Sequence, residues 1–187
     1  MEVKYIDYKE YFDGFGLENF LSEDECQDFI KMSEDIGYEE AEINSEGDSR
    51  IAKNIRNNDR VIINDQKLAD NIYIKSKNYL PEVGLWKSYG VNSHIRFYRY
   101  IPGQYFKNHV DGTIKGESDN EKSILTFLVY LNDNFTGGGT SFANQIIKAK
   151  QGSALIFFHG QWHSAESLIS GTKYVLRLDV MYRKILL

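Results

Sequence analysis

The chain has 187 residues, with 27 acidic side chains against 22 Lys and Arg, and its formal net charge at pH 7 is −5. This acidity argues against a nucleic-acid partner, because phosphate binding depends on a positive protein surface, and the single cysteine, Cys26, excludes a disulfide within the chain and favours a reducing compartment. The length fits one domain, and the sequence shows neither a signal-peptide pattern nor an apolar run of membrane-spanning length, so we expect a cytoplasmic, intracellular protein with no membrane partner.

Two helices are predicted in the first part of the chain. Ser22 and Glu25 match the capping box that begins a helix, and Gly37 matches the glycine that ends one. A second helix is predicted over about 65–79 from its helical spacing of apolar residues. The segment 44–49 between these helices has the composition of a loop.

Short apolar and β-branched runs predict strands in the rest of the chain. These runs cover residues 61–63, 94–100, 124–131, 154–158 and 173–182. The runs 124–131 and 154–158 are apolar on both faces, so we expect both strands to be buried. Helices followed by many strands indicate an α+β chain with an antiparallel core. We therefore expect one domain over 1–187, with helical support and a substrate loop over about 1–90 and the β core over about 91–187.

His109, Asp111 and His163 form the main candidate metal site. Residues two apart on a strand point to the same side, so the His109 imidazole and the Asp111 carboxylate would converge. His163 follows the buried strand 154–158 and could return to the same place. Two histidines and one carboxylate suit Fe(II), and this set leaves positions open for a bidentate co-substrate and dioxygen. The alternatives are a surface turn without a metal, or His159 in place of His163.

Two cations in the last predicted strand are candidates for binding an anion. Lys173 and Arg177 lie four residues apart and share one face of the strand with Val175. Burying a cation is costly unless it is paired, and the carboxylate of a co-substrate would supply the partner. The alternative is that Lys173 reaches solvent at the strand edge while Arg177 pairs with an acidic neighbour such as Asp179.

Several segments between about residues 93 and 183 carry a pattern that goes beyond the three candidate ligands. They are Tyr100 to Asp111, with a Pro-Gly-Gln turn before His-Val-Asp; Thr126 to Asp133; Gly137 to Phe142; and Lys150 to Phe157. The interval from His163 to Lys173 is ten residues. Together these features resemble the prolyl 4-hydroxylase-like Fe(II)/2-oxoglutarate-dependent oxygenases. Gly139 stands where that family usually has glutamate, and we interpret it as a neutral variation of the turn.

The resemblance implies a fold and a set of cofactors. The fold is a double-stranded β-helix (a jelly-roll, cupin-like core) with supporting N-terminal helices. The implied cofactors are Fe(II), held by His109, Asp111 and His163, and 2-oxoglutarate as co-substrate, with ascorbate as a further ligand. Lys173 takes the position that pairs with the distal carboxylate of 2-oxoglutarate, although Arg177 could share or replace this role. Further positions near the co-substrate are those of Tyr130, Thr126 and Tyr100.

The implied activity is a dioxygenase that hydroxylates a C–H bond, with a prolyl residue in a protein or peptide as the leading substrate. A free amino acid or another small molecule is the second option, and the acidic composition disfavours a third, the oxidative repair of nucleic acid. A catalytically silent binding module of the same fold is the alternative outside the enzymes. We expect the substrate to lie between two polar loops, 44–60 with Arg56 and Arg60, and 112–121, unless these loops are simply exposed.

Overall fold

The computed structural model describes residues 2–41, 43–45, 48–50, 52 and 54–185. In chain order the elements are β1 (Lys4–Asp7), β2 (Gly14–Glu18), α1 (Glu23–Ile36), β3 (Glu39–Glu40), β4 (Ile43–Ser45), β5 (Asp48–Arg50), β6 (Asp59–Asn64), α2 (Gln66–Ser76), β7 (Trp86–Val91), β8 (His94–Tyr100), β9 (Phe106–His109), β10 (Glu121–Tyr130), β11 (Thr136–Gly137), β12 (Thr140–Phe142), β13 (Gln145–Ile147), β14 (Ala154–Phe158), β15 (His163–Ala165), β16 (Leu168–Ser170) and β17 (Lys173–Lys184).

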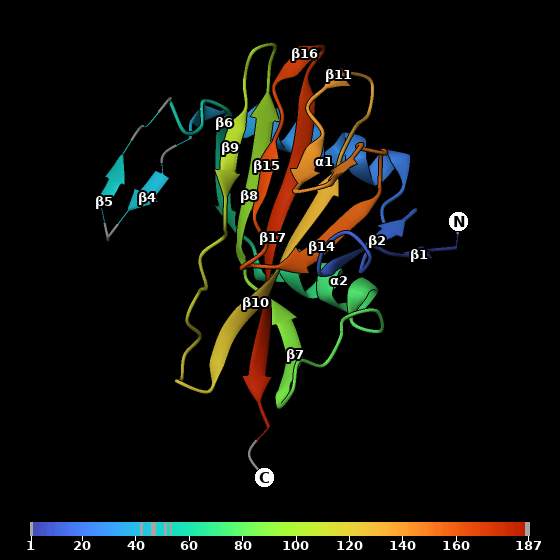
Figure 1. Ribbon diagram of the computed structural model, residues 1–187, viewed down its shortest axis with the longest axis vertical. Helices are drawn as coiled ribbons and strands as arrows, with labels where there is room; N and C mark the ends of the chain where they lie inside the picture. The colour runs from blue at the N-terminus through green and yellow to red at the C-terminus, as the bar shows by residue number, and fades with distance from the viewer. Residues whose placement is uncertain (1, 42, 46–47, 51, 53, 186–187) are drawn as a thin grey trace.

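Most of the strands belong to two antiparallel sheets that enclose the inner core (Figure 1). The larger sheet has the order β1-β2-β14-β10-β17-β8-β6-β3, with β7 paired to the far end of β17. The smaller sheet has the order β13-β12-β15-β9, and β11 pairs with β16 beside it. This is the jelly-roll core that the family resemblance implies, and the predicted strands over 94–100, 154–158 and 173–182 are present as β8, β14 and β17.

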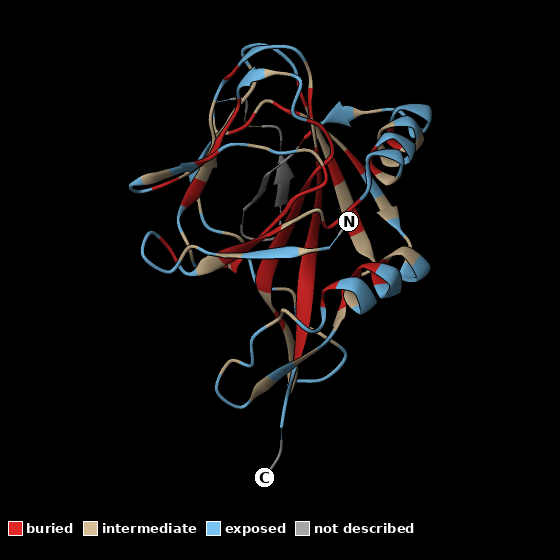
Figure 2. Ribbon diagram, turned by 90° about the vertical axis from the view of Figure 1, so that its right-hand side faces the viewer, coloured by how far each residue is buried: buried red, intermediate tan, exposed pale blue. Residues whose placement is uncertain are grey.

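The central strands β10 and β17 are buried on both faces, which explains their continuous apolar sequence. On β10, Phe127 and Val129 belong to the outer apolar cluster, against which α1 and α2 pack. Leu128 and Tyr130 alternate with them and belong to the inner cluster between the sheets. Figure 2 shows the buried strands in the middle, with the two helices lying along one side and turning their exposed faces outward.

Both predicted helices are present, and the residues at their ends can be compared with the predicted start and stop residues. In α1 the capping box is formed as predicted, since the Ser22 side chain accepts a hydrogen bond from the Glu25 amide and the Glu25 carboxylate accepts one from the Ser22 amide. Gly37 ends α1 with a φ of 95°, a conformation that favours glycine. The prediction for α2 was about three residues too long, because the chain turns after Ser76, whose hydroxyl donates to the Ile72 carbonyl.

The expectation of mainly helical support over about 1–90 was incomplete. Strands β1, β2 and β6 from this part of the chain extend the larger sheet, with β2 paired to β14 and β6 paired to β8. The sequence pattern of a strand is weak in β2, because Gly14 and Gly16 have no side chain that could take part in an alternation of apolar and polar residues. An added Cβ at Gly14 would lie 2.6 Å from the Ile156 carbonyl oxygen, so close packing against β14 requires glycine there.

The predicted loop over 44–49 is a hairpin, β4 paired with β5, in its described part. Glu46 and Gly47 lie outside the described residues. In the part of the chain that the structure describes, no helix combines the length and apolarity needed to cross a membrane.

Candidate metal centre and co-substrate pocket

His109, Asp111 and His163 come together where two strands of the smaller sheet meet. His109 ends β9 and pairs directly with His163, the first residue of β15. Asp111 lies two residues beyond β9, where its amide donates to the His159 carbonyl at 3.0 Å. One ligand atom from each of the three residues lies within 4.8 Å of the others. The sequence spacing therefore predicted the convergence correctly, although Asp111 is held by a loop and not by the strand itself.

The backbone fixes how the two imidazoles point. Nδ1 of His109 lies 2.8 Å from the Lys107 carbonyl, and Nδ1 of His163 lies 3.0 Å from the Gln161 carbonyl. Because a carbonyl can only accept, each Nδ1 carries the proton and each Nε2 keeps its lone pair. The Nε2 atoms lie 3.9 Å (His109) and 3.7 Å (His163) from the carboxylate oxygens of Asp111. Three lone pairs are thus presented to one point.

The protonation states match those that a divalent metal requires. Burial lowers the pKa of His109 to about 4, and it also lowers the pKa of His163, so both imidazoles are neutral at pH 7. Burial alone would raise the pKa of Asp111, but the nearby Arg177 cation, with His163 and the Thr126 hydrogen bond, holds it well below its usual range. Neutral histidines and an ionised carboxylate fit Fe(II), for which two histidines and one carboxylate are a common oxygenase set.

A pocket between the two sheets opens beside these three residues. Its other lining residues come from β8, β9, β10, β12, β15 and β17, and they are Tyr98, Tyr100, Phe106, Leu128, Thr140, Ser164, Ala165, Lys173, Val175 and Arg177. The predicted shared face of Lys173, Val175 and Arg177 is therefore the face that lines this pocket.

Lys173 is the deeply buried cation of the pocket. It is 2% exposed, and its Nζ donates to the Gly138 carbonyl at 2.5 Å. The rings of Tyr100 and Tyr130 lie 5.2 and 5.6 Å from Nζ. Among the described residues, no carboxylate lies within ion-pair distance of Lys173. Burial lowers its pKa to about 7, with Glu166 acting in the opposite direction, and the alternative of a lysine reaching solvent at the strand edge is wrong.

Arg177, by contrast, already has carboxylate partners. Its Nη1 lies 2.8 Å from Asp179 Oδ2, and its Nη2 lies 3.3 Å from Asp111 Oδ1. Arg96 forms a second ion pair with Asp179 at 2.9 Å. Burial alone would lower the pKa of Arg177, but Asp111 and Asp179 raise it, so the guanidinium stays charged. The alternative that paired Arg177 with Asp179 is therefore confirmed, and the structure adds Asp111 to the pair.

The three remaining candidate positions do not all face the pocket. Tyr100 lines it, whereas the Tyr130 hydroxyl is buried and bonded to Thr140 Oγ1 at 2.7 Å. Thr126 lies on the same face of β10 as Tyr130, but behind the metal ligands. Its hydroxyl donates to Asp111 Oδ2 at 2.5 Å. The contact of Thr126 that the structure shows is therefore with Asp111, and its expected contact with the co-substrate stays a prediction.

Sequence reasoning missed several pocket residues because their signal depends on long-range pairing. Thr140 belongs to the glycine-rich element, and it lines the pocket when β12 pairs with β15. Gly139 before it has a packing role, since an added Cβ would lie 2.5 Å from a methyl carbon of Ile146. Phe106 lines the pocket and stacks on His109 with ring centroids 3.6 Å apart.

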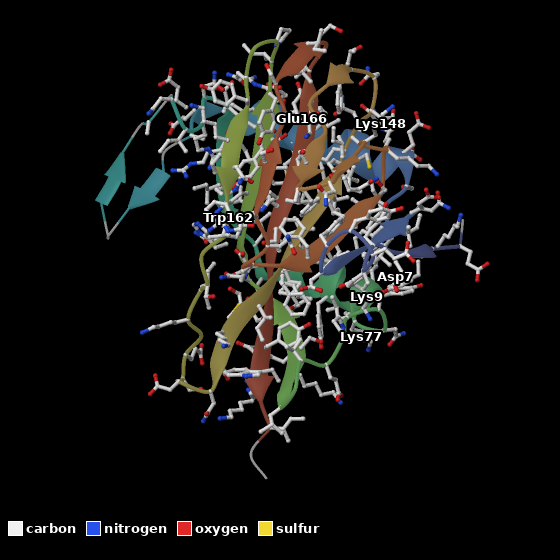
Figure 3. All side chains as sticks on the ribbon, in the orientation of Figure 1. Asp7, Lys9, Lys77, Lys148, Trp162 and Glu166 are labelled. Carbon is white, nitrogen blue, oxygen red and sulfur yellow. The ribbon has the colours of Figure 1, made fainter. Side chains whose placement is uncertain are left out.

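The two predicted substrate loops occupy different places. Arg56 is 5% exposed and lies over the rings of Phe106 and Tyr98, 4.2 and 4.8 Å from their centroids. Arg60 lies on β6, opposite Tyr98 of β8. The other loop, 112–121, leaves β9 and descends beside the first half of β10 (Figure 1). Trp162 precedes His163, is 57% exposed and lies on the β9 side of the molecule (Figure 3).

Comparisons with known proteins agree with this geometry. Residues 95–178 match the family model of the 2OG-Fe(II) oxygenase superfamily. A putative prolyl 4-hydroxylase of Acanthamoeba polyphaga mimivirus is 26% identical over 191 residues, which cover 91% of this chain and 74% of the relative.

Solved prolyl hydroxylases share the fold at low sequence identity. A viral collagen prolyl hydroxylase from Paramecium Bursaria Chlorella virus-1, solved as a 2OG complex, has a TM-score of 0.61 at 19% identity and covers 90% of this chain and 94% of its own. A Pseudomonas putida prolyl-4-hydroxylase has a TM-score of 0.63 at 15% identity, covering 93% and 94%. A prolyl hydroxylase from Trichoplax adhaerens, in complex with a hypoxia inducible factor peptide fragment, has a TM-score of 0.64 at 16% identity, covering 88% and 81%.

Proposed function

We propose that this chain, a 2-oxoglutarate-dependent dioxygenase whose residues 95–178 match the 2OG-Fe(II) oxygenase superfamily, hydroxylates a prolyl residue in a protein or peptide. The relatives support this substrate class, since the curated one is a putative prolyl 4-hydroxylase and one solved neighbour holds a peptide fragment. Two apolar side chains beside the ligands are also exposed, Trp162 at 57% and Val110 at 43%, and they offer a surface for a peptide.

In this proposal, His109, Asp111 and His163 hold Fe(II). The observation that carries it is that these three residues and a buried lysine meet in one pocket. The bound metal, with 2-oxoglutarate and dioxygen, supplies the oxidising chemistry. The chain's own residues keep both imidazoles neutral with Nε2 free, keep Asp111 ionised, and line the pocket with apolar groups that limit the access of water.

Lys173 is the residue that we assign to the distal carboxylate of 2-oxoglutarate. Its ammonium lacks a carboxylate partner among the described residues, while Arg177 already contacts Asp111 and Asp179. Tyr100 and Thr140 line the same pocket and would position the co-substrate, with the Tyr130 hydroxyl bonded to that of Thr140. Arg177 would then act on the metal ligand Asp111 and not on the co-substrate.

We also propose that residues 1–187 act as one oxygenase domain. Strands β1, β2 and β6 complete the same sheet that carries β10 and β17, so the N-terminal part is continuous with the core. A free amino acid or another small molecule remains the alternative substrate, because fold and ligand set do not encode the substrate.

The site is tested by adding Fe(II) and then 2-oxoglutarate to anaerobic protein and recording the visible charge-transfer absorption. We expect a band in the wild type and none in His109→Ala. Lys173→Met should weaken 2-oxoglutarate binding about 10- to 100-fold, because a charge-assisted hydrogen bond contributes about 1.5–3 kcal/mol. Lys148→Ala is the control, since Lys148 is an exposed lysine outside the pocket (Figure 3). A band that survives Lys173→Met unchanged would remove Lys173 from the role of anchor.

The substrate is tested separately with peptides that contain proline and matched peptides in which alanine replaces it. The proposal predicts that only the prolyl peptides accelerate succinate release and gain one oxygen atom by mass. Succinate release without any response to prolyl peptides would reject the substrate and leave the oxygenase site intact.

A further inference from the structure

Three polar side chains behind the metal ligands are buried and belong neither to the ligand set nor to the pocket lining. They are Thr126 on β10, Ser123 at the start of the same strand and His159 just after β14, with exposures of 0%, 1% and 4%. Burying polar groups is costly unless each one is hydrogen-bonded. These three are bonded to one another in a single line that ends at Asp111.

The direction of every hydrogen bond in this line can be assigned. The Asp111 carboxylate only accepts, so the Thr126 hydroxyl donates to Oδ2 at 2.5 Å. Thr126 Oγ1 lies 2.9 Å from His159 Nδ1, and since the Thr126 proton is already engaged, Nδ1 must be the donor. His159 Nε2 then has a lone pair, which accepts from Ser123 Oγ at 2.8 Å. The opposite tautomer would face Thr126 Oγ1 with a lone pair and leave the Ser123 proton without this acceptor.

The line continues into the loop that follows the metal ligands. Ser123 Oγ accepts from the Ile114 amide at 2.8 Å, and the Ser123 amide donates to the Ile114 carbonyl at 2.8 Å. Ile114 is therefore held by Ser123 through both of its backbone polar groups. A single sequence of donors and acceptors joins the backbone of loop 112–121 to the carboxylate of Asp111.

A local irregularity in β10 makes this line possible. The register of β10 against β17 shifts between Ser123, opposite Met181, and Leu125, opposite Val180. The extra residue changes which side chains point inward, so Ser123 joins Thr126 on the side that faces His159. Without the bulge, strict alternation would place Ser123 on the face opposite to Thr126. The backbone is thus shaped to bring both hydroxyls to one histidine.

We propose that His159 is a positioning residue for Asp111, and that the line Ile114–Ser123–His159–Thr126 couples loop 112–121 to the metal ligand. The inference rests on the assignment of Asp111 as a ligand in the proposed function. His159 fixes the Thr126 hydroxyl as a donor to Oδ2, while Arg177 lies 3.3 Å from Oδ1, so both carboxylate oxygens are oriented by the protein. By reciprocity, metal binding at Asp111 stabilises the loop.

The test measures the Fe(II) dissociation constant of the full chain in anaerobic titrations without 2-oxoglutarate or substrate. Thr126→Val and His159→Leu remove the donors at nearly constant volume and should weaken Fe(II) binding about 10- to 100-fold, the usual effect of losing an outer partner of a metal ligand. Thr126→Ser keeps the hydroxyl, and His159→Asn keeps an N–H donor near the position of Nδ1, so both should recover most of the affinity. Thr136→Val, at an exposed threonine of β11, is the matched control.

Amide hydrogen exchange of residues 114–117, read by mass spectrometry, supplies a signal that is independent of turnover. Fe(II) should slow this exchange in the wild type and should do so much less in Thr126→Val, when each folded protein is compared with its own metal-free form. Equal Fe(II) affinity and equal protection in wild type, Thr126→Val and His159→Leu would overturn the coupling and leave the proposed function standing. A wild type that binds no Fe(II) would overturn both.

Discussion

Lys173 and Arg177 show how partners, more than residue type, decide what a buried cation can do. The sequence placed both on one face of a strand, and the structure confirms that face. The sequence offered Asp179 as a partner of Arg177, but spacing could not show that Asp111 is a second one, because Asp111 comes from a loop distant in the sequence. Lys173 contacts only the Gly138 carbonyl and two tyrosine rings among the interactions described, so no carboxylate there balances the charge of its ammonium.

The pKa of Lys173, about 7 in the free protein, predicts a pH dependence for 2-oxoglutarate binding. A bound carboxylate favours the ammonium form and raises this pKa, so binding takes up a proton above pH 7. Affinity should therefore be full below about pH 7 and fall as pH rises, by up to about tenfold per pH unit, until the pKa of the complex is passed. Dissociation constants measured at several pH values would show this slope in the wild type, whereas Lys173→Arg should show a weaker one. A pH-independent wild type would contradict the assigned anchor.

Arg177 leads to a prediction about stability. Arg177→Met would leave the buried carboxylates of Asp111 and Asp179 without one of their cations, which should lower the free energy of unfolding of the metal-free protein by about 3–5 kcal/mol. Urea unfolding measures this loss. Arg96→Met is the comparison, because it removes one partner of Asp179 and leaves the contact between Arg177 and Asp111 in place. An equal or larger loss for Arg96→Met would show that the pairing with Asp111 contributes little.

At the scale of elements, the sequence signals were reliable where they are local. The capping box of α1 depends on residues three apart and was read correctly. The β10 segment was recognised as buried, but its bulge at Ser123 was not, because a bulge is defined by the partner strand. Strand β2 was missed for a related reason, since its glycines have meaning only against β14.

The tight contact at Gly14 predicts that Gly14→Ala destabilises the protein. The new Cβ would lie 2.6 Å from the Ile156 carbonyl oxygen and 2.9 Å from Phe157 Cβ, and overpacking of this kind costs about 1–3 kcal/mol. Thermal or urea unfolding measures the loss. Gly90→Ala on β7 is the control, since an added Cβ there meets no atom within 4 Å. Equal stabilities of the two variants would mean that β2 can move away from β14 at no cost.

At the scale of the whole molecule, the fold gathers the site from segments between Tyr98 and Arg177. The order of these segments along the chain, and the interval between His163 and Lys173, allowed most of the site to be predicted from sequence. The positions of Thr126 and Thr140 could not be predicted with the same success, because they depend on how β10 and β12 face each other across the pocket.

Metal binding should therefore stabilise the whole molecule and not only the site. A ligand that binds the folded state alone, at about 100 times its dissociation constant, adds about 2.7 kcal/mol to the free energy of unfolding. We expect this increase for Fe(II) under anaerobic conditions, and its absence in His163→Ala. An increase of the same size in His163→Ala would place the metal elsewhere.

The ion-pair cluster around Asp111 has a consequence for how the site is filled. Asp111 and Asp179 carry two negative charges, and Arg96 and Arg177 carry two positive ones, so this cluster is electroneutral before anything binds. A divalent cation alone would leave it with an excess of positive charge, and the 2-oxoglutarate dianion would cancel that excess. In a water-poor pocket such an imbalance is weakly screened. Cation and dianion should therefore each bind more tightly when the other is present.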